Sequence, residues 1–364
     1  MYFKSVSLEN FRNYERLSLE FDEKLNLFLG KNAQGKTNLL ESLFIMGLGK
    51  SFRTNNDRDM IKFSSSNAKA SSLVIDEDRE TSIEISYLGE GKIIKVDGIK
   101  LDRSIDLLEN VYVVIFSPDD LKIIKEGPDN RRRFLDRELC QIKPVYYSDL
   151  GNYKKVLKQR NMLLRQNSSD EALFAVFDEA LCDYGVRIIE ERERFTERIC
   201  EISRKIHSDI SGGKENLLIT YETRLSKDIK TRVERKQEYR DLLDSHFQSD
   251  LMKGYTGFGP HKDDLKIEID GIDIRMYGSQ GQQRTAALSM KLAEIGLIKQ
   301  ETGKNAVLLL DDVLSELDQS RQRYLIESMS DVQVFITTTE IDEKLLSMLP
   351  KGKTFTVSGG NVLT

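Results

Sequence analysis

One glycine-rich loop early in the sequence has the residue types and spacing of a phosphate-binding loop. Residues 30–37, Gly-Lys-Asn-Ala-Gln-Gly-Lys-Thr, fit the pattern G-x-x-x-x-G-K-[ST] between a strand-like and a helix-like run. Its glycines let backbone N–H groups turn inward toward phosphate oxygens, and the following helix adds its positive end. Lys36 is expected to reach the β- and γ-phosphates of ATP, and the Thr37 hydroxyl to bind Mg²⁺. The predicted contacts to the nucleotide are Gly30, Lys31, Asn32, Ala33, Gln34, Gly35, Lys36, Thr37 and Asn38.

Two adjacent carboxylates at the end of an apolar run supply a second part of such a site. Residues 305–312, NAVLLLDD, read as a buried strand that ends in Asp311 and Asp312. We expect Asp311 to hold Mg²⁺ through water, and Asp312 to act as general base or to position the attacking water. Many buried strands end in aspartate, so these two residues alone are weak evidence for a nucleotide site. They become stronger evidence because the chain also has a phosphate-binding loop.

A polar loop before a helix provides the third part. Ser279-Gln280-Gly281-Gln282-Gln283 resembles the signature loop of ABC-type ATPases, whose usual form is LSGGQ. Ser315-Glu316-Leu317-Asp318 resembles their D-loop. The ABC resemblance implies that the signature loop caps a nucleotide held by a partner chain. Because this chain has one copy of each element, a complete site then needs a head-to-tail homodimer with twofold symmetry. The expected contacts in trans are Ser279, Gly281 and Gln282.

The apolar pattern describes the elements that must position these residues. Alternating or continuous apolar runs predict strands at 3–11, 17–30, 111–118 and 332–339, and hairpins at 81–101 (with a turn at Asp97-Gly98) and 265–278. Helices are predicted at 38–48, 284–300 and 321–329. Between about 130 and 250, apolar residues recur at steps of three and four, which is typical of a short coiled coil or helical hairpin, at most about 80 Å long.

The predicted fold is therefore an α/β ATPase head of the ABC type with an inserted α-helical arm lobe. The head would combine a parallel sheet covered by helices with an antiparallel β subdomain. We place the first half of the head at 1–125, the inserted helical lobe at 126–255 and the second half of the head at 256–364.

Composition and charge exclude several classes of protein. The chain has 364 residues, of which 39% are hydrophobic and 32% charged, which is enough apolar material for a core. Neither a run of about 20 apolar residues nor a signal-peptide core is present, which argues against a channel and a secreted protein. Three widely spaced cysteines fit a reducing cytoplasm better than disulfides or zinc. The net charge of −5 gives no hint of nucleic acid, so any DNA contact needs a local basic surface.

Several longer blocks resemble the RecF family of bacterial recombination-repair ATPases and, through it, the head domains of SMC-type proteins. They are NFRNY (10–14), GKTNLLESL (35–43), KSFR (50–53), SPDDLKIIKEGPDNRRRFLD (117–136), GFGPHKDDL (257–265) and LLLDDVLSELD (308–318). The resemblance implies ATP binding, ATP-dependent dimerisation, binding of gapped or junction DNA, and loading of a recombinase with RecR- and RecO-type partners. It also implies that Arg12 contacts the nucleotide.

Three positions depart from the related ABC pattern. Asp312 stands where ABC transporters usually have Glu, and the shorter side chain moves the carboxylate by roughly 1.5 Å, so slow hydrolysis is expected. Thr337-Thr338-Thr339 replaces the switch histidine, with Thr338 as a weak substitute. No Q-loop glutamine is found near residues 117–120.

Basic residues of the middle segment are candidates for DNA contact. On the first arm helix we expect contacts to duplex phosphates, with little sequence specificity, and the alternative is a solvated helix face. The candidates are Lys154, Lys155, Lys158 and Arg160. Arg131-Arg132-Arg133 is either a phosphate clamp or a set of salt bridges, since Phe134-Leu135 beside it indicates partial burial. His261 fits a loop that braces the signature region better than a metal site.

Two functions from different classes compete. The first is an ATP-gated DNA clamp whose hydrolysis resets a dimer. The second is an SMC-like structural scaffold in which ATP is chiefly an assembly ligand. The short predicted arm favours the clamp, and the missing Q-loop Gln and switch His argue against a transporter subunit.

Overall fold

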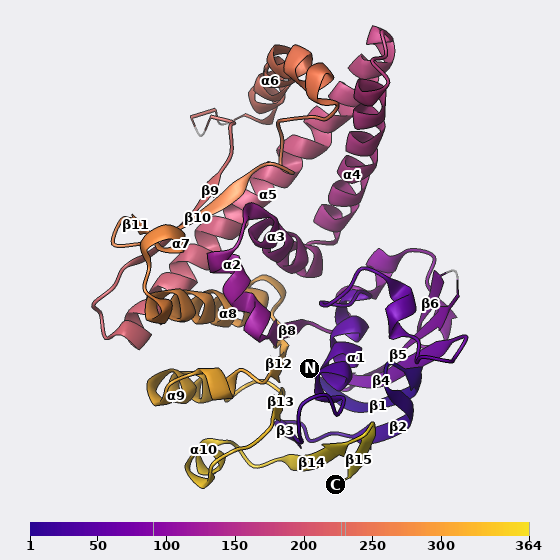
Figure 1. The fold of residues 1–364 in the computed structure, drawn as a ribbon, viewed down its shortest axis with the longest axis vertical. Helices are drawn as coiled ribbons and strands as arrows, with labels where there is room; N and C mark the ends of the chain where they lie inside the picture. The colour runs from indigo at the N-terminus through magenta and orange to yellow at the C-terminus, as the bar shows by residue number, and fades with distance from the viewer. Residues whose placement is uncertain (90, 227, 230, 364) are drawn as a thin grey trace. The chain divides into compact units, whose positions relative to one another are not determined.

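The computed structural model describes residues 1–89, 91–226, 228–229 and 231–363, and the chain forms two compact units (Figure 1). The head unit comprises Met1–Asp120 and Leu288–Thr364, and the arm unit comprises Leu121–Ala287. The sequence pattern had grouped residues 256–287 with the head. Strands β10 (Asp264–Ile269) and β11 (Ile272–Asp273) instead form a sheet with β9 (Leu217–Glu222), which explains why the arm unit extends this far.

The head unit contains the predicted parallel sheet, in the order β15-β14-β3-β13-β12-β8. The apolar residues of its central strands are buried because both faces of this sheet are covered, as expected for parallel strands. Strand β15 alone pairs antiparallel, at one edge. The strands are β3 (Leu25–Leu29), β8 (Val113–Phe116), β12 (Val307–Asp311), β13 (Val334–Thr338), β14 (Lys353–Ser358) and β15 (Asn361–Leu363).

A second, antiparallel sheet of the head unit has the order β2-β1-β4-β5-β6-β7. Its strands are β1 (Tyr2–Phe11), β2 (Tyr14–Glu20), β4 (Ala68–Asp76), β5 (Arg79–Leu88), β6 (Gly91–Val96) and β7 (Ile99–Lys100). Helix α1 (Lys36–Leu48) shares one apolar core with residues of both sheets. The predicted α/β head with an antiparallel β subdomain is thus confirmed.

Two strand predictions of the head unit need correction. The single strand expected over 17–30 is divided between β2 and β3, which lie in different sheets. The break follows from Asp22, whose carboxylate accepts hydrogen bonds from the amides of Lys24 and Leu25 and so turns the backbone. Asp97-Gly98 does form a turn, but it joins β6 to the short β7.

The arm unit is mostly helical, as predicted, and its small sheet adds one unpredicted strand, β9, to the strands expected within 265–278. Its helices are α2 (Leu121–Lys125), α3 (Pro128–Ile142), α4 (Pro144–Arg165), α5 (Glu171–Ser211), α6 (Arg232–Lys253) and α7 (Ile274–Tyr277). Helix α5 has 41 residues and spans about 60 Å, shorter than the expected limit. The missed strand β9 alternates buried with exposed or half-buried residues, and its partner β10 alternates buried with half-buried ones. The predicted hairpin at 265–278 ends early because residues 274–277 turn into α7.

Three further helices complete the fold. Helix α8 (Gln280–Thr302) begins within the residues of the arm unit and ends within those of the head unit. Helices α9 (Gln319–Glu327) and α10 (Glu343–Met348) belong to the head unit. No helix among the described residues combines the length and apolar character that a membrane crossing requires.

A polar network in the core of the arm unit surrounds the loop from Gly259 to Asp263. The buried Arg192 donates hydrogen bonds to the Pro260 carbonyl at 2.6 Å and to Asp136 at 2.7 Å. The ring of His261 bonds through Nε2 to the Thr256 carbonyl at 2.9 Å and through Nδ1 to the Tyr153 hydroxyl at 2.8 Å. Both ring nitrogens are therefore engaged, and the loop is tied to α3, α4, α5 and β9 of the arm unit. A role in bracing the signature region stays a prediction.

Two side chains of this network, His261 and Asp263, are expected to change the free energy of unfolding in opposite directions as the pH falls. Burial lowers the pKa of His261 to about 4 and raises the pKa of Asp263 to about 6. Between about pH 4 and 6.5 the unfolded chain binds more protons at His261, so stability is lost there as the pH falls. Between about pH 4 and 6 the folded chain binds more protons at Asp263, so stability is gained as the pH falls.

Urea unfolding at a series of pH values tests these signs. We expect Asp263→Asn to lose stability more steeply than the unsubstituted chain when the pH falls from 6.5 to 4. His261→Asn should lose it less steeply over the same range. Identical slopes for all three proteins would contradict the assignment.

Candidate nucleotide-binding site

The phosphate-binding loop joins β3 to α1, as its sequence predicts. Helix α1 begins at Lys36, and Gly35 before it has a φ of +116°, which side-chain-bearing residues rarely adopt. A Cβ atom at Gly35 would lie 2.5 Å from the amide nitrogen of the Asn13 side chain, and one at Gly30 would lie 2.3 Å from the carbonyl oxygen of Val357. Both glycines are thus required by close packing, and the loop's exposed residues are Lys31, Asn32 and Ala33.

The side chain of Lys36 folds back over the loop. Its Nζ donates hydrogen bonds to the carbonyl oxygens of Gly30 and, at 2.9 Å, Lys31. The residue is 7% exposed, and burial lowers the pKa of its ammonium group, against the opposing influence of Asp312 and Asp311. A buried ammonium beside carbonyl oxygens favours an anionic ligand, because the ligand's negative charge offsets the cost of burial.

The two predicted magnesium ligands meet in the head unit. The hydroxyl of Thr37, from α1, donates to Asp311 Oδ1 at 2.9 Å, although 274 positions separate the two residues. Thr337, from the neighbouring strand β13, donates to the same oxygen at 2.8 Å. Burial raises the pKa of Asp311, and the two hydroxyl hydrogen bonds oppose this effect. Thr337 was not singled out from the sequence, but the parallel register that places it opposite Asp311 accounts for the contact.

Asp312 has an unusual backbone conformation at the end of β12. Its φ is +56°, in the left-handed region that costs a non-glycine residue about 1–2 kcal/mol. Its amide donates to the carbonyl oxygen and to the hydroxyl of Thr337, both at 3.1 Å. The hydroxyl of Ser315 donates to its backbone oxygen at 2.8 Å and reaches its carboxylate at 3.3 Å. Thr338, the expected substitute for the switch histidine, instead donates to the carbonyl of Glu340.

Arg12 forms an ion pair with a buried carboxylate at the edge of this site. Its Nε and Nη2 atoms donate to the two oxygens of Glu41 at 2.8 and 2.7 Å, and the Glu41 side chain is 0% exposed. Arg53 approaches the same carboxylate at 3.3 Å and donates to Asn38 at 2.7 Å. Glu41 thus holds two arginines near α1. The sequence reading proposed Arg12 as a nucleotide contact and did not identify Glu41.

Residues that are distant in sequence also form hydrogen bonds with the phosphate-binding loop. The Asn13 side chain donates to the carbonyl of Gln34 at 3.1 Å and accepts from Asn38 at 2.8 Å. Gly359 and Gly360, in the turn between β14 and β15, donate to the side chain and backbone oxygens of Gln34 at 2.6 and 3.2 Å. The loop is therefore fixed before any ligand binds.

The signature motif forms the start of α8 within the arm unit. Ser279 precedes the helix, and Gln280, Gly281 and Gln282 make its first turn. The amide of Gln282 donates to Ser279 Oγ at 3.2 Å, and the amide of Ser279 donates to Gln282 Oε1 at 2.9 Å. This reciprocal pair is a capping box, which explains the spacing of Ser279 and Gln282 in conformational terms. Ser279 is exposed.

One of the predicted DNA contacts is wrong. Arg160 is fully buried, with its guanidinium bonded to Asp178 at 2.6 Å, Asp250 at 3.0 Å and Thr256 at 2.8 Å. It lies seven positions after Tyr153 and four before Leu164, so it shares the buried face of α4 with them. Lys155 and Lys158 are exposed and form no ion pair with the described residues, whereas Lys154 pairs with Asp136 at 3.3 Å.

The triple-arginine run is mainly structural. Arg131 is buried and binds both oxygens of Asp264 at 2.6 and 2.8 Å. Arg132 donates to the carbonyl of Asp263 at 2.7 Å. Only Arg133 of the three is exposed, so the salt-bridge reading accounts for the first two members.

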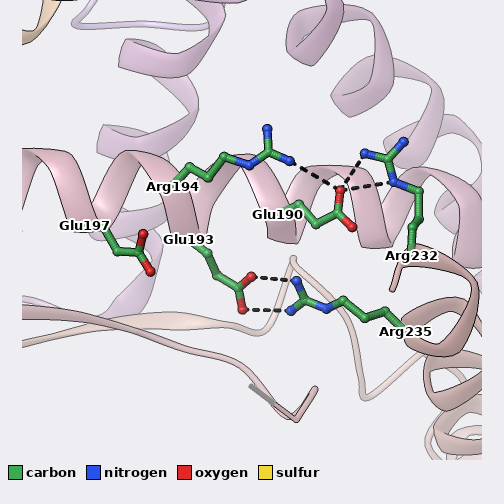
Figure 2. A pocket seen from close by; sticks show the side chains of 6 residues that line it. All are labelled: Glu190, Glu193, Arg194, Glu197, Arg232 and Arg235. Carbon is green, nitrogen blue, oxygen red and sulfur yellow. Dashed lines mark hydrogen bonds and ion pairs between the residues drawn. The ribbon is translucent and has the colours of Figure 1, made fainter. Parts of the chain in front are cut away.

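A pocket of about 460 Å³ in the arm unit is lined by charged residues that largely neutralise each other (Figure 2). Glu190 binds Arg232 and Arg194, and Glu193 forms a two-pronged pair with Arg235. Three acidic and three basic side chains therefore line it, Glu197 being the sixth. Such a compensated surface has no excess positive charge for phosphate.

Comparison with known proteins identifies the family. The profile described as RecF/RecN/SMC N terminal domain matches residues 2–347. The DNA replication and repair protein RecF of Clostridioides difficile is 42% identical over 100% of this chain and 98% of its own length. The chain belongs to the RecF family of DNA replication and repair proteins. The RecF protein of Clostridium novyi is 44% identical over 100% of this chain and 99% of its own.

Solved structures agree with this family. A structure titled as the recombination mediator protein RecF-ATP in the RecFOR pathway has a TM-score of 0.92 and 39% identity, covering 100% of this chain and 97% of that chain. The Smc head domain of Pyrococcus furiosus has a TM-score of 0.54 at 17% identity, covering 99% and 95%, which supports the fold alone. The family resemblance seen in the sequence is thus confirmed.

Proposed function

We propose that the chain is an ATP-dependent DNA-binding protein of recombinational repair that dimerises head to tail on ATP and hydrolyses it slowly. The observation that carries this proposal is the contact between Thr37 and Asp311, beside a phosphate-binding loop already fixed in shape. It is supported by the related solved structure of RecF-ATP. A cytoplasmic location is part of the same proposal.

The residues around Thr37 suit a magnesium ion. A hydroxyl and a carboxylate oxygen are hard ligands of the kind that Mg²⁺ takes in nucleotide sites, where it keeps several waters. Thr37 would bind the ion directly and Asp311 through water. When bound, the ion would neutralise charge on the β- and γ-phosphates. Thr337, hydrogen-bonded to Asp311, would keep the carboxylate oriented.

Different residues of the chain would then bind the phosphates and act on the attacking water. Loop amides and Lys36 would bind the phosphates, with Arg12 as a further contact if its guanidinium leaves Glu41. Asp312 would accept a proton from the attacking water, or orient that water. Its hydrogen bonds to Thr337 and Ser315 hold its backbone in the left-handed conformation. In the proposed dimer, Ser279 and Gly281 at the start of α8 would face the nucleotide of the partner chain.

Ser279→Arg tests the assignment in trans. The exposed Ser279 side chain would become a long cation at the start of α8, where positive charge is unfavourable. We expect ATP binding by the monomer to stay within about twofold while ATP-dependent dimerisation falls at least about tenfold, or 1.4 kcal/mol. Sedimentation with and without ATP measures the dimer. Loss of nucleotide binding by the monomer would contradict an assignment in trans.

Asp312→Asn tests the role of the second carboxylate. Asparagine also tolerates the left-handed region, so the backbone at this position should be preserved. Loss of a general base should lower the rate of hydrolysis by about 10²–10⁴-fold and leave ATP binding intact, so that the dimer persists. Phosphate release and dimer lifetime are the measurements. Asp331→Asn, at an exposed acid of the head unit, is the matched control. Hydrolysis by Asp312→Asn at the parental rate would assign the base to another group.

DNA binding is the part of the proposal that needs direct measurement. Gel shifts with gapped and blunt duplexes over a salt series would report shape preference and the number of phosphates contacted. We expect tighter binding to gapped DNA, and a salt slope smaller by about one for Lys155→Ala or Lys158→Ala. Equal binding to both DNAs would remove the proposed substrate preference. The RecFOR pathway named for the related structure supports RecR- and RecO-type partners.

A further inference from the structure

The signature turn is tied to the long arm helix by one carboxylate. Gln282 Nε2 donates to Glu215 Oε1 at 3.0 Å, and His207 Nε2 lies 3.0 Å from Glu215 Oε2. His207 is on α5 and fully buried, whereas Gln282 is in the first turn of α8. Glu215 therefore bridges two helices through both of its carboxylate oxygens.

The segment that carries Glu215 is itself fixed at both ends. After α5, Gly212 adopts a left-handed conformation and the Gly213 amide donates to the carbonyl of Ser208 at 2.8 Å. On the other side, the Asn216 amide donates to the carboxylate of Asp270 at 3.1 Å, next to the start of β9. Glu215 is thus held in position by its backbone as well as by its side chain.

Both ends of the Gln282 amide group have a partner in this arrangement. Its oxygen accepts from the Ser279 amide and its nitrogen donates to Glu215. Ser279 Oγ accepts from the Gln282 amide and retains its own proton for another acceptor. The exposed Ser279 hydroxyl and the amino-terminal end of α8 are therefore free to meet a phosphate, while Gln282 is held by Glu215 and Ser279.

We propose that Glu215 is a positioning residue for nucleotide-dependent dimerisation, which locks the signature turn through Gln282 and is itself anchored by His207. Gln282 then acts as the clamp between Glu215 and Ser279, and does not touch the nucleotide. This revises the contact expected for Gln282, and it rests on the head-to-tail dimer of the proposed function.

Gln282→Glu breaks the clamp without removing the helix cap. Glutamate serves at this position of a capping box as well as glutamine does, so α8 should still begin at the same residue. Its carboxylate would meet that of Glu215, and like charges in direct contact repel. We expect dimerisation with a non-hydrolysable ATP analogue to weaken at least about tenfold. Binding of the analogue by the monomer should not change, since the phosphate-binding loop is untouched.

The exchanged pair Glu215→Gln/Gln282→Glu provides the decisive test. The exchanged pair again places one amide group opposite one carboxylate. The amide at position 215 now donates the hydrogen bond to the carboxylate at position 282. We expect dimerisation to return to within about threefold of the unsubstituted chain. Glu201→Gln/Gln282→Glu is the matched control, because Glu201 is an exposed acid of α5, and it should give no rescue. If the exchanged pair dimerises no better than Gln282→Glu alone, the proposed clamp is wrong. Gln282 would then again be expected to contact the nucleotide directly.

Thermal unfolding without nucleotide separates the clamp from the proposed function. The cycle formed by the unsubstituted chain, the two single variants and the exchanged pair should show favourable coupling between positions 215 and 282. Absence of coupling would show that the clamp does not exist. If coupling is present but the unsubstituted chain does not dimerise on ATP, the proposed function fails, and the dimerisation role of Glu215 fails with it.

Discussion

Replacing Lys36 with alanine is expected to lower the affinity for ATP by about a hundredfold or more and to abolish ATP-dependent dimerisation. Burial already lowers the pKa of this ammonium, which donates hydrogen bonds to the carbonyl oxygens of Gly30 and Lys31. Two phosphate oxygens would replace these neutral acceptors, and a hydrogen bond to a charged group contributes about 1.5–3 kcal/mol. Loss of two such bonds gives the expected change in affinity.

Titration with a fluorescent ATP analogue measures this loss, and sedimentation with ATP measures the dimer. Lys24→Ala is the matched control, because Lys24 is an exposed lysine of the head unit that lies outside the loop. It should bind the analogue as the unsubstituted chain does. An equal amount of dimer in Lys36→Ala and the unsubstituted chain would refute the proposed role of the loop in assembly.

Arg160→Ala is expected to destabilise the arm unit by about 3–5 kcal/mol. The substitution removes a buried cation and leaves the carboxylates of Asp178 and Asp250 without it, which is the costly way to break a buried ion pair. Burial already raises the pKa of Asp178 despite the opposing charge of Arg160. For a unit of this size the melting temperature should fall by roughly 6–20 °C.

Lys158→Ala, two positions earlier on α4, separates stability from DNA contact. Its side chain is exposed, so its loss should change stability by no more than about 0.5 kcal/mol while weakening DNA binding. Calorimetry of both variants, with gel shifts on the same samples, makes the comparison. A fully stable Arg160→Ala that binds DNA poorly would restore Arg160 to the DNA-contacting surface.

The phosphate-binding residues of the head unit could be predicted because they lie close together in the sequence. The glycines, Lys36 and Thr37 lie within eight positions, and their strand–loop–helix context follows from apolar periodicity. Asp311 was found because an apolar strand ends there. The contacts of Thr337 and Glu41 were missed, since the sequence blocks that contain them do not show which distant residues they meet. Thr337 is placed by the register between two parallel strands, and Glu41 by the packing of α1 against the turn that carries Arg12.

The arm unit shows where periodicity alone is insufficient. Steps of three and four predicted its helices, and the same spacing separates the two basic residues. Arg160 lies seven positions after Tyr153 and four before Leu164, which places it on the apolar face of α4. Lys158 lies on another face and is exposed. The strand β9 was hidden because it stands alone between two helices and finds its partner, β10, only after α6. Tertiary pairing decided the case of β9.

The position of β3 between β13 and β14 has a consequence for synthesis of the protein on the ribosome. Leu25 pairs with Val334, so β3 cannot form its part of the sheet until β13 and β14 have been translated, about 300 residues later. At typical elongation rates of about 5–20 residues per second, this delay is roughly 15–60 s. The nascent chain meanwhile exposes one of its most apolar segments, and nucleotide can stabilise it only near the end of translation. We expect early folding to be the stage at which chaperones matter most for this protein.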